Sequence, residues 1–450
     1  MDTLLKATIL DTAPRIAARD VSCEALAEAC LARIRGRNPV VNAFITVCED
    51  AAVEQAREAD RAIGAGRYRG PLHGIPISLK DLIDVAGVRT TAASRVLEGN
   101  VASADAPVVS RLRAAGAVIL GKTNLHEFAF GTTSEDSAYG PVRNPRDTGR
   151  SAGGSSGGSA AAVVDGMGFA SVGTDTGGSI RIPAAACGCV GLKPTRDELP
   201  CDGIVPLSWS LDHVGPIARS VADAWVLFDA MRGAPRIPGN PAHACGRHPP
   251  RIGVLGGYFG EVLDAGVRES IAASLDRLAA AGAALVPLEL PGAASIAQTY
   301  LHIQLPEASA YHAGTIEQHP ELYTPAVRKR LEMGRTVLAE DYVRARREAD
   351  RLRTVVDEAL EGCDVLALPT LPIPAPPLGA DSMSIDGQPV PVRALMLRLT
   401  QLFDLTGHPA LSMPGGPTGA GLPVGLQLVG RLNGTPALLG TALWCERFLG

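Results

Sequence analysis

Lysine is scarce in this sequence of 450 residues. Only five of its 42 basic residues are lysines, and the other 37 are arginines. The five are Lys6, Lys80, Lys122, Lys193 and Lys329. Arginine does not lose its proton in proteins, whereas lysine does so when its environment favours the neutral amine. Each lysine is therefore a candidate for a role that arginine could not fill.

The cysteines lack the pattern of a disulfide framework or a metal site. There are nine, an odd number, and no two are spaced as C-x-x-C. Cys187 and Cys189 are two residues apart, which is a poor spacing for zinc. We therefore predict small buried cysteines, no disulfide framework and no metal.

Membrane spans and a basic face are also missing from the sequence. No window reaches about 18 uninterrupted apolar residues, the length that spans a bilayer, and the first apolar run is too short for a signal peptide. The net charge is −5, with both signs scattered along the chain. These features predict a cytoplasmic protein with no membrane or nucleic-acid partner. Aromatic residues make up 4%, which disfavours a large aromatic cage.

What the sequence does have is a hydrophobic content of 46%, enough for a large core. Short apolar strands alternate with helical patterns, which predicts an α/β sheet with helices on both faces. We predict strands at 74–80, 117–121, 169–173, 251–255, 283–290, 364–369, 409–413 and 424–430. We predict helices within 20–66, 104–116, 159–167, 267–282 and 298–361, loops at 131–159 and 174–188, and a surface connection at 233–250.

Two glycine–serine stretches, residues 153–159 and 175–181, lie close together in the sequence. Glycine lets the backbone approach a ligand closely, and consecutive N–H groups can form an anion-binding concavity. In acyl transfer this concavity is an oxyanion hole, and the candidate donors are Thr176, Gly177, Gly178 and Ser179.

Three other interpretations of these stretches are weaker. A flexible linker is disfavoured because both stretches adjoin apolar segments. A phosphate-binding loop is disfavoured because GxxxxGK[ST] is absent. Residues 154–158 fit G-x-S-x-G, but the polar residues before them make a poor strand, which a nucleophile elbow requires.

The longer motifs make the sequence similar to the amidase signature family. They are GIPISLKD (74–81), GKTNLHEFAFGTTSEDSAYGPVRNP (121–145), GGSSGGSAAAV (153–163), GTDTGGSIRIPAAACGCVGLKPT (173–195), LDHVGPIARSVAD (211–223) and the segment 408–431. The resemblance covers nearly the whole chain in one order. It implies a mixed, twisted sheet of about eleven strands covered by helices on both faces. It also implies one domain over 1–450, with a catalytic core at about 70–225 and a substrate-pocket region at about 290–400.

The resemblance assigns a catalytic triad to three residues. Ser179 of TGGS is the nucleophile, Ser155 bridges protons after a cis peptide bond from Gly154, and Lys80 is the base. Lysine acts as a base only when it is neutral, and burial favours that form. We expect Lys80 to be buried at the end of an apolar strand, whereas the alternative is an ion pair with Asp81 or Asp84.

Other residues receive roles from the same motifs. Ala129, Phe130 and Gly131 align with a segment that lines the acyl pocket, although Phe130 also suits plain core packing. We expect Asp175 and Arg181 to hold the nucleophile loop by hydrogen bonds. The remaining marked side chains are expected to be structural: Lys122, Lys193, His126, His213 and His408.

These features predict an amidase that converts a small-molecule carboxylic amide to a carboxylate and ammonia or an amine through an acyl-enzyme, without a cofactor. The alternative within the family is the glutaminase-like A subunit of a tRNA-dependent amidotransferase. Residues 320–346 resemble stand-alone amidases more closely. Family members often form homodimers, and the sequence does not distinguish aliphatic from aryl substrates.

Overall fold

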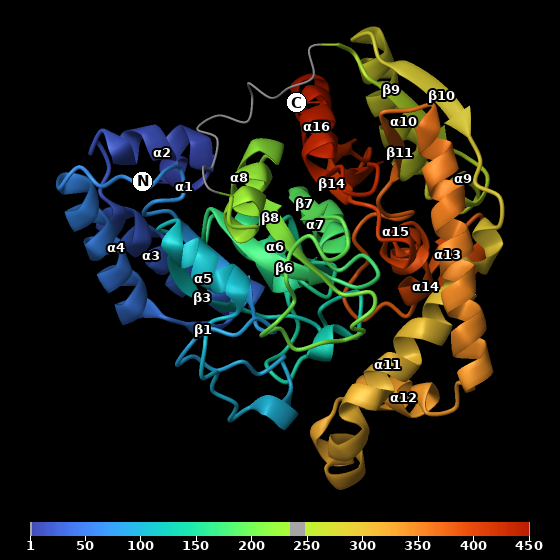
Figure 1. The fold of residues 1–450 in the computed structure, drawn as a ribbon, viewed down its shortest axis with the longest axis horizontal. Helices are drawn as coiled ribbons and strands as arrows, with labels where there is room; N and C mark the ends of the chain where they lie inside the picture. Colours follow the sequence, from blue (N-terminus) through green and yellow to red (C-terminus); the bar gives the residue numbers. More distant parts are fainter. Residues whose placement is uncertain (1, 235–247, 450) are drawn as a thin grey trace.

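The computed structural model describes residues 2–234 and 248–449, and most of the predicted connection at 233–250 lies outside them. Eleven strands form the main sheet of the described chain (Figure 1). They are β1 (Phe44–Val47), β2 (Pro76–Lys80), β3 (Val118–Thr123), β6 (Ala170–Asp175), β7 (Val190–Lys193), β8 (His213–Ala218), β9 (Arg251–Leu255), β10 (Ala284–Leu288), β11 (Val365–Pro369), β14 (Ala410–Pro417) and β15 (Pro423–Val429). Two small hairpins pair β4 (Arg143–Asn144) with β5 (Asp147–Ser151) and β12 (Ser382–Ile385) with β13 (Gln388–Pro391).

The strand order is β1-β3-β2-β6-β8-β7-β14-β15-β11-β9-β10, so the sheet joins early and late parts of the chain. At one end β2 lies between β3 and β6 and runs parallel to both. At the other end β9 runs parallel to β10 and β11. The central strands β6, β8, β7, β14 and β15 pair antiparallel. The sheet is therefore mixed, with eleven strands, as the family resemblance implies.

Helices cover both faces of the sheet. They are α1 (Asp2–Leu5), α2 (Ile9–Ala17), α3 (Cys23–Val41), α4 (Glu49–Gly64), α5 (Pro107–Ala114), α6 (Gly157–Val164), α7 (Arg181–Cys187), α8 (Val221–Met231), α9 (Tyr258–Glu261), α10 (Ala265–Ala280), α11 (Ile296–Gln318), α12 (Pro325–Gly334), α13 (Ala339–Glu361), α14 (Val392–Arg398), α15 (Gln401–Thr406) and α16 (Thr435–Leu449).

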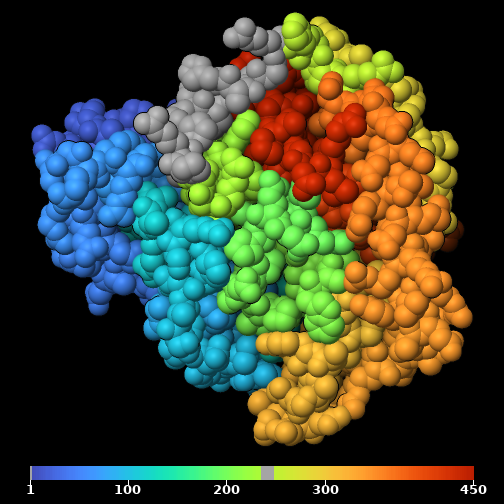
Figure 2. Space-filling view, in the orientation of Figure 1, coloured from blue at the N-terminus to red at the C-terminus, as the bar shows by residue number. Residues whose placement is uncertain are grey.

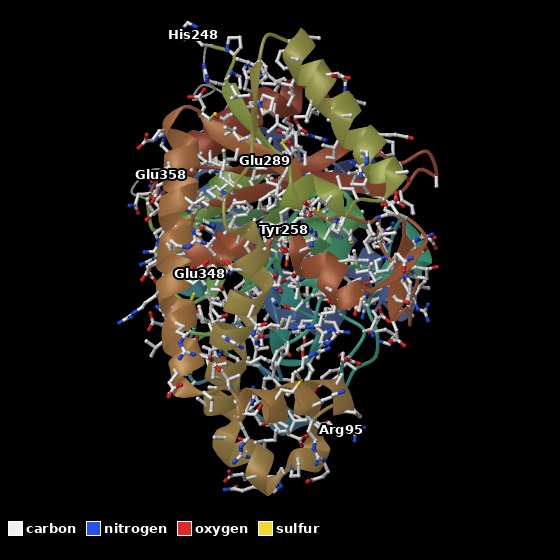
Figure 3. The ribbon with its side chains drawn as sticks, turned by 90° about the vertical axis from the view of Figure 1, so that its right-hand side faces the viewer. Arg95, His248, Tyr258, Glu289, Glu348 and Glu358 are labelled. Carbon is white, nitrogen blue, oxygen red and sulfur yellow. The ribbon has the colours of Figure 1, made fainter. Side chains whose placement is uncertain are left out.

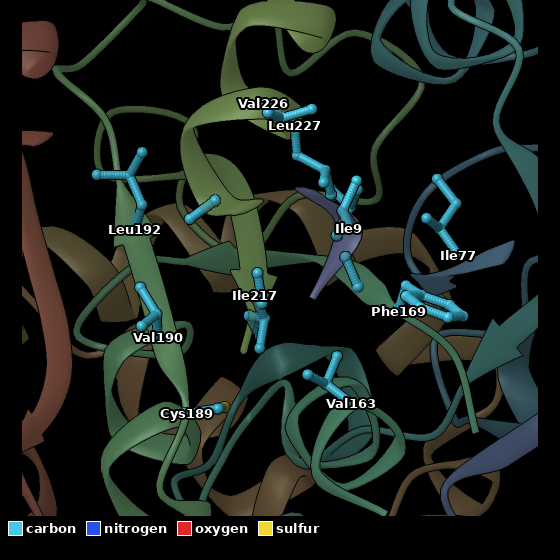
Figure 4. Packing of buried hydrophobic residues seen from close by; sticks show 14 of the residues in the cluster. Ile9, Ile77, Val163, Phe169, Cys189, Val190, Leu192, Ile217, Val226 and Leu227 are labelled. Carbon is cyan, nitrogen blue, oxygen red and sulfur yellow. The ribbon is translucent and has the colours of Figure 1, made fainter. Parts of the chain in front are cut away.

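The helices fall into groups that Figure 1 separates clearly. The N-terminal α3 and α4 pack together and against β3, at the blue end of the molecule. The pair α11 and α13 packs at the opposite, gold and orange end, together with α12 and α15. Near the centre, Ile217 of β8 lies between Val163 of α6 and Leu227 of α8, all fully buried (Figure 4). The central sheet is thus buried on both faces.

The eight predicted strands are all present, but the sequence patterns missed three strands of the main sheet and the four short hairpin strands, of which β4 and β5 lie in the predicted loop 131–159. In the main sheet the missed strands are β1, β7 and β8. Glycine interrupts β7, and glycine and proline interrupt β8, and such residues normally weaken a strand prediction. At Gly215 an added Cβ would lie 2.1 Å from the carbonyl oxygen of Leu192, so glycine there permits close strand approach.

The loop prediction over 174–188 was wrong in its second half, because residues 181–187 form α7. Pro183 suggested a break, but it is the third residue of this helix. Proline is tolerated in the first turn, where the backbone N–H has no partner within the helix. The change matters because α7 begins two residues after Ser179.

Two further properties concern the whole described chain. None of the helices in residues 2–234 and 248–449 combines the length and apolarity that a membrane crossing requires. Of the eight cysteines that the structure describes, six are buried, which confirms the predicted burial for most of them.

Candidate active site

Lys80 ends β2 and has a fully buried side chain. All five residues of this strand are buried because the strand is covered on both faces. The Lys80 Nζ donates to Ser155 Oγ at 2.7 Å and to Thr174 Oγ1 at 2.7 Å. Since β2 and β6 are parallel neighbours, their carboxyl ends place Lys80 beside Thr174.

The environment of Lys80 favours its neutral form. Burial lowers the pKa of the Lys80 amine to about 7, and the charges of Asp175 and Asp212 oppose this shift. The alternative ion pair with Asp81 is not formed, because Asp81 pairs with Lys122 at 2.9 Å. Among the described residues no carboxylate lies within ion-pair distance of Lys80.

The Ser155 segment is fixed by its main chain. The peptide bond between Gly154 and Ser155 is cis, as predicted. The Ser155 carbonyl accepts hydrogen bonds from the His126 N–H at 3.2 Å and the Ser134 hydroxyl at 3.0 Å. The next residue begins the approach to α6. Ser155 is thus held rigidly with its hydroxyl on Lys80.

Ser179 lies next to this segment, on the loop between β6 and α7. The Ser156 N–H donates to the Ser179 carbonyl at 3.2 Å, which joins the two glycine–serine stretches. Ser179 is 5% exposed, whereas Ser155 is fully buried. Within the described chain, no hydrogen bond links the Ser179 and Ser155 hydroxyls. Lys80 therefore contacts Ser155 directly, whereas Ser179 is joined to this segment through the main chain of Ser156.

Asp175 and Arg181 hold the Ser179 loop from below. Asp175 accepts from the N–H groups of Gly178 and Ile180 at 2.6 and 3.1 Å. Arg181 Nε and Nη2 donate to the same carboxylate at 3.0 and 2.9 Å. Although burial opposes it, the Arg181 charge keeps the pKa of Asp175 below its usual value. The prediction that these two residues brace the loop is confirmed.

The N–H groups of the loop differ in their availability. Gly178 must be removed from the candidate oxyanion donors, because its N–H already donates to Asp175 at 2.6 Å. The N–H groups of Thr176, Gly177 and Ser179 make no hydrogen bond to other residues in the described chain. They stay free to meet a ligand.

Tight packing holds the outer side of the loop. Gly178 has φ +131°, a conformation that favours glycine. The Thr400 hydroxyl donates to the Gly177 carbonyl at 2.5 Å. A Cβ on Gly177 would lie 2.5 Å from the Tyr300 hydroxyl, so this ring packs directly against the loop. The sequence motifs had not singled out Tyr300 or Thr400, since both lie far away in the chain.

A cavity of about 320 Å³ opens at this end of the sheet. Its polar wall includes Thr174, Thr176, Asp212 and His213. The rest of its wall, which is mostly apolar, comprises Leu82, Ala129, Cys201, Asp202, Gly203, Ile204, Val205, Pro206, Leu207 and Trp209. The green segment near residue 200 lies at the surface beside the cyan segment in Figure 2. This cavity adjoins the Lys80 partner Thr174.

The cavity contains only some of the residues predicted to bind substrate. Ala129 and Thr176 line it, whereas Phe130 and Gly131 are not among its lining residues. Phe130 is buried, with the guanidinium groups of Arg330 and Arg393 over its ring. The Cβ position of Gly131 is occupied by the His126 ring at 2.0 Å. Both therefore have packing roles here.

Asp212 is a site residue that the sequence patterns did not reveal. Its carboxylate accepts from the Thr176 hydroxyl at 2.6 Å and from the Leu207 and Ser208 N–H groups at 2.9 and 3.1 Å. Burial raises the pKa of Asp212 to about 6. It lies in the motif LDHVGP, which was the available signal. Asp212 connects the cavity wall to the Ser179 loop through Thr176.

The remaining marked residues have structural contacts. Lys193 Nζ donates to the His408 carbonyl at 2.7 Å and lies 3.3 Å from His213 Nε2. The ring of His408 lies 3.1 Å from Asp357, and that of His126 lies 3.2 Å from Asp136. Within the described chain, none of the three imidazole rings is hydrogen-bonded to Ser155 or Ser179. In residues 2–234 and 248–449 no group of three or more His, Cys, Asp or Glu could hold a metal.

Comparisons with known proteins show which family this chain resembles. The family model described as Amidase matches residues 25–439. An amidase of Pseudomonas putida is 42% identical over 92% of this chain and 90% of its own length. The A subunit of the glutamyl-tRNA(Gln) amidotransferase of Koribacter versatilis is 38% identical over 94% of each chain. A crystal structure of an amidase superposes with a TM-score of 0.93, 38% identity and coverage of 99% and 100% of the two chains.

Proposed function

Because the chain belongs to the amidase signature family, we propose that it hydrolyses a carboxylic amide through an acyl-enzyme formed on Ser179. The enzyme class, a hydrolase of carbon–nitrogen bonds, follows from the family. The observation that carries the proposed mechanism is the 2.7 Å contact between the buried Lys80 amine and the Ser155 hydroxyl.

In the proposed first step, Ser179 Oγ attacks the amide carbon. Its proton passes to Ser155 Oγ while the Ser155 proton passes to neutral Lys80 Nζ. This requires the Ser179 hydroxyl to turn toward Ser155 when substrate binds, and such contacts often tighten only in the substrate complex. The negative charge on the carbonyl oxygen is met by the free N–H groups of Thr176, Gly177 and Ser179.

The second half of the cycle uses the same relay in reverse. The protonated Lys80 returns its proton through Ser155 to the leaving nitrogen, and the C–N bond breaks. A water molecule then attacks the acyl-enzyme and loses a proton to the relay. The ester C–O bond breaks, the relay returns this proton to Ser179 Oγ, and the carboxylic acid is released. No charge moves through solvent, because Lys80, Ser155 and Thr174 are all buried.

We further propose that residues 70–225 form the catalytic core of a single domain and 290–400 supply the substrate pocket. Lys80, Ser155, Ser179 and Asp212 all come from the first range. Tyr300 of α11 reaches the nucleophile loop from the second range, which supports the division.

The alternative function is that of an ammonia-releasing component of a transferase complex. This alternative is supported by the 38% identity to the A subunit of a glutamyl-tRNA(Gln) amidotransferase. We favour the stand-alone hydrolase because of the higher identity to the Pseudomonas putida amidase and the resemblance of residues 320–346 to stand-alone amidases. A stand-alone enzyme requires no partner protein.

The purified single chain tests both proposals. It should release ammonia or amine from simple amides, and hydroxylamine should intercept the acyl-enzyme as a hydroxamate. Ser179→Ala should abolish both reactions, whereas Ser110→Ala, an exposed serine of α5, should leave them unchanged. The stand-alone assignment would be overturned if glutamine were the only amide hydrolysed and if ammonia release required added partner proteins. Full activity of a folded Ser179→Ala variant would overturn the nucleophile.

A further inference from the structure

Two arginines from different helices meet at one phenylalanine. Arg330 of α12 donates from Nη1 to the Phe130 carbonyl at 2.6 Å, and Arg393 of α14 donates to the same oxygen at 3.4 Å. Their guanidinium carbons lie 5.8 and 5.9 Å from the centroid of the Phe130 ring. Two like charges are thus brought together in a partly buried place.

Neither guanidinium has a carboxylate partner within ion-pair distance among the described residues. The acid whose charge acts on Arg330 is Asp136, and its carboxylate lies 3.2 Å from the His126 ring. Burial, reinforced by Arg330, lowers the pKa of Arg393 to about 10. Desolvating a guanidinium without a counter-charge is unfavourable, so this pair would gain from an anionic ligand.

Arg393 also forms part of the wall of a second cavity of about 320 Å³. Its other polar lining residues are Arg398 and Gln401, and its apolar wall comprises Tyr258, Ala297, Leu301, Pro391, Ala394 and Leu397. Figure 3 faces the side of the molecule that carries Tyr258. The cavity therefore joins a hydrocarbon surface to a positive end.

Among the described residues, one exposed carboxylate lies within ion-pair distance of the two arginines of this second cavity. The Arg398 guanidinium lies 3.8 Å from the Tyr258 ring centroid and donates to the Tyr258 carbonyl at 2.9 Å. Arg398 Nε is buried and has no hydrogen-bond partner in the described chain. The acid near Arg398 is Glu261 at 3.4 Å, and its side chain is 65% exposed, so solvent screens it.

The second cavity lies close to the nucleophile loop. Tyr300, next to the lining residue Leu301, packs against Gly177. Thr400, next to Gln401, hydrogen-bonds the Gly177 carbonyl. On the other side, Phe130 follows Ala129, which lines the cavity beside Thr174. The charge of Arg393 acts on the pKa of Tyr300, so Arg393 lies near the ring that packs against Gly177.

We propose that Arg393, supported by Arg330, forms an anion-binding subsite, and that the substrate is an amide carrying a carboxylate remote from the scissile bond. This inference rests on the proposed amidase function. The flat guanidinium of Arg393 suits the two oxygens of a carboxylate, and the apolar wall suits a short hydrocarbon chain. The substrate extends from Ser179 past Tyr300 to Arg393.

Paired substrates of equal chain length test the proposal. One series comprises monoamides of dicarboxylic acids, and the other comprises amides with a methyl group in place of the carboxylate. The wild-type enzyme should prefer the charged member by about tenfold or more in kcat/KM. Arg393→Gln and Arg330→Gln should each remove most of this preference through KM, while the neutral series changes little. Arg344→Gln, on the exposed face of α13, is the matched control.

A binding measurement tests the anion-binding subsite independently of the proposed catalytic function. Calorimetry with glutarate as probe should show binding to the wild type and to Ser179→Ala, weakened about tenfold or more by Arg393→Gln. Thermal unfolding checks that each variant is folded, and Arg330→Gln serves if Arg393→Gln is not. An unchanged charged-to-neutral ratio in the folded variants would overturn the subsite. If neither amide series is hydrolysed, the proposed function fails, and glutarate binding alone decides the subsite.

Discussion

Lys80 Nζ lies 2.7 Å from both the Ser155 and Thr174 hydroxyls, and this buried amine has only hydroxyl partners within hydrogen-bond distance in the described chain. An amine whose hydrogen-bond partners are neutral gains no ion pair to offset its lost hydration. It is therefore poised to accept a proton near neutral pH. The neighbouring Asp81 does not disturb this state, because it is occupied by Lys122.

Lys80→Met should lower kcat by several orders of magnitude without unfolding the protein. Methionine has a similar shape and removes only the amine, so the strand β2 keeps its packing. Steady-state kinetics and thermal unfolding of the same preparation check this. Lys329→Met, an exposed lysine of α12, is the control and should retain full activity. A folded, fully active Lys80→Met enzyme would contradict the base assignment.

Activity should rise with pH through about 7 and then level. The pKa of Lys80 is lowered to about 7 by burial, so the neutral base predominates only above that pH. Protonation below it removes the base, and kcat/KM should fall about tenfold for each further pH unit in the limiting region. A pH profile of kcat/KM measures the midpoint. A midpoint above pH 9 for this rise in kcat/KM would contradict the lowered pKa of Lys80.

Asp212→Asn should move the midpoint of the rise in kcat/KM to lower pH. The Asp212 charge raises the pKa of Lys80, so removing it makes the neutral amine easier to form. The asparagine oxygen can still accept from the Thr176 hydroxyl, but the NH2 group then faces the N–H groups of Leu207 and Ser208, so both of these contacts are lost. The measurement is the midpoint of the same profile, with Asp350→Asn on the exposed side of α13 as control. A shift toward higher pH would show that Asp212 acts through structure instead of charge.

Much of this arrangement could be predicted from the sequence, because the motifs that carry it consist of consecutive residues. The strand β2 and the two glycine–serine stretches carry their information in consecutive residues, so Lys80, Ser155, Ser179, Asp175 and Arg181 were identifiable. The strands β7 and β8 were not, because Gly191 and Gly215 weaken any strand pattern. The space beside Gly191 is filled by Ile180 and Ala184, and that beside Gly215 by Leu192 of β7.

Contacts between distant segments could not be predicted. Tyr300 and Thr400 reach the nucleophile loop from α11 and from the turn before α15, more than 100 residues along the chain. The use of the Gly178 N–H by Asp175 was also hidden, since it depends on the loop's exact turn. Long-range packing, which no short motif records, determined these details.

Arg181→Met should destabilise the protein by about 3–5 kcal/mol, because it leaves two buried carboxylates without their partner. Arg181 Nη2 lies 2.9 Å from Asp175 and 2.6 Å from Asp404, and all three side chains are fully buried. Urea unfolding measures the loss. The exposed ion pair between Arg344 and Asp341 is the comparison, and Arg344→Met should cost less than about 1 kcal/mol. Equal losses in the two variants would contradict this account.

Gly177→Ala should reduce kcat sharply while leaving the fold intact. The added Cβ would lie 2.5 Å from the Tyr300 hydroxyl and 2.8 Å from its Cζ, so either the ring or the loop must move. Moving the loop displaces the N–H groups of Thr176, Gly177 and Ser179 from the oxyanion, and losing one such donor costs about 10²–10³ in kcat.

Tyr300→Leu distinguishes a steric cause from a backbone one. Leucine lacks the ring atoms that the alanine Cβ would meet, so the double variant Gly177→Ala/Tyr300→Leu should recover activity relative to Gly177→Ala alone. A double-mutant cycle on kcat, with Tyr300→Leu as the reference single variant, measures this coupling. If the two losses simply add, the ring does not restrain the loop, and the strict need for glycine at 177 must come from the backbone itself.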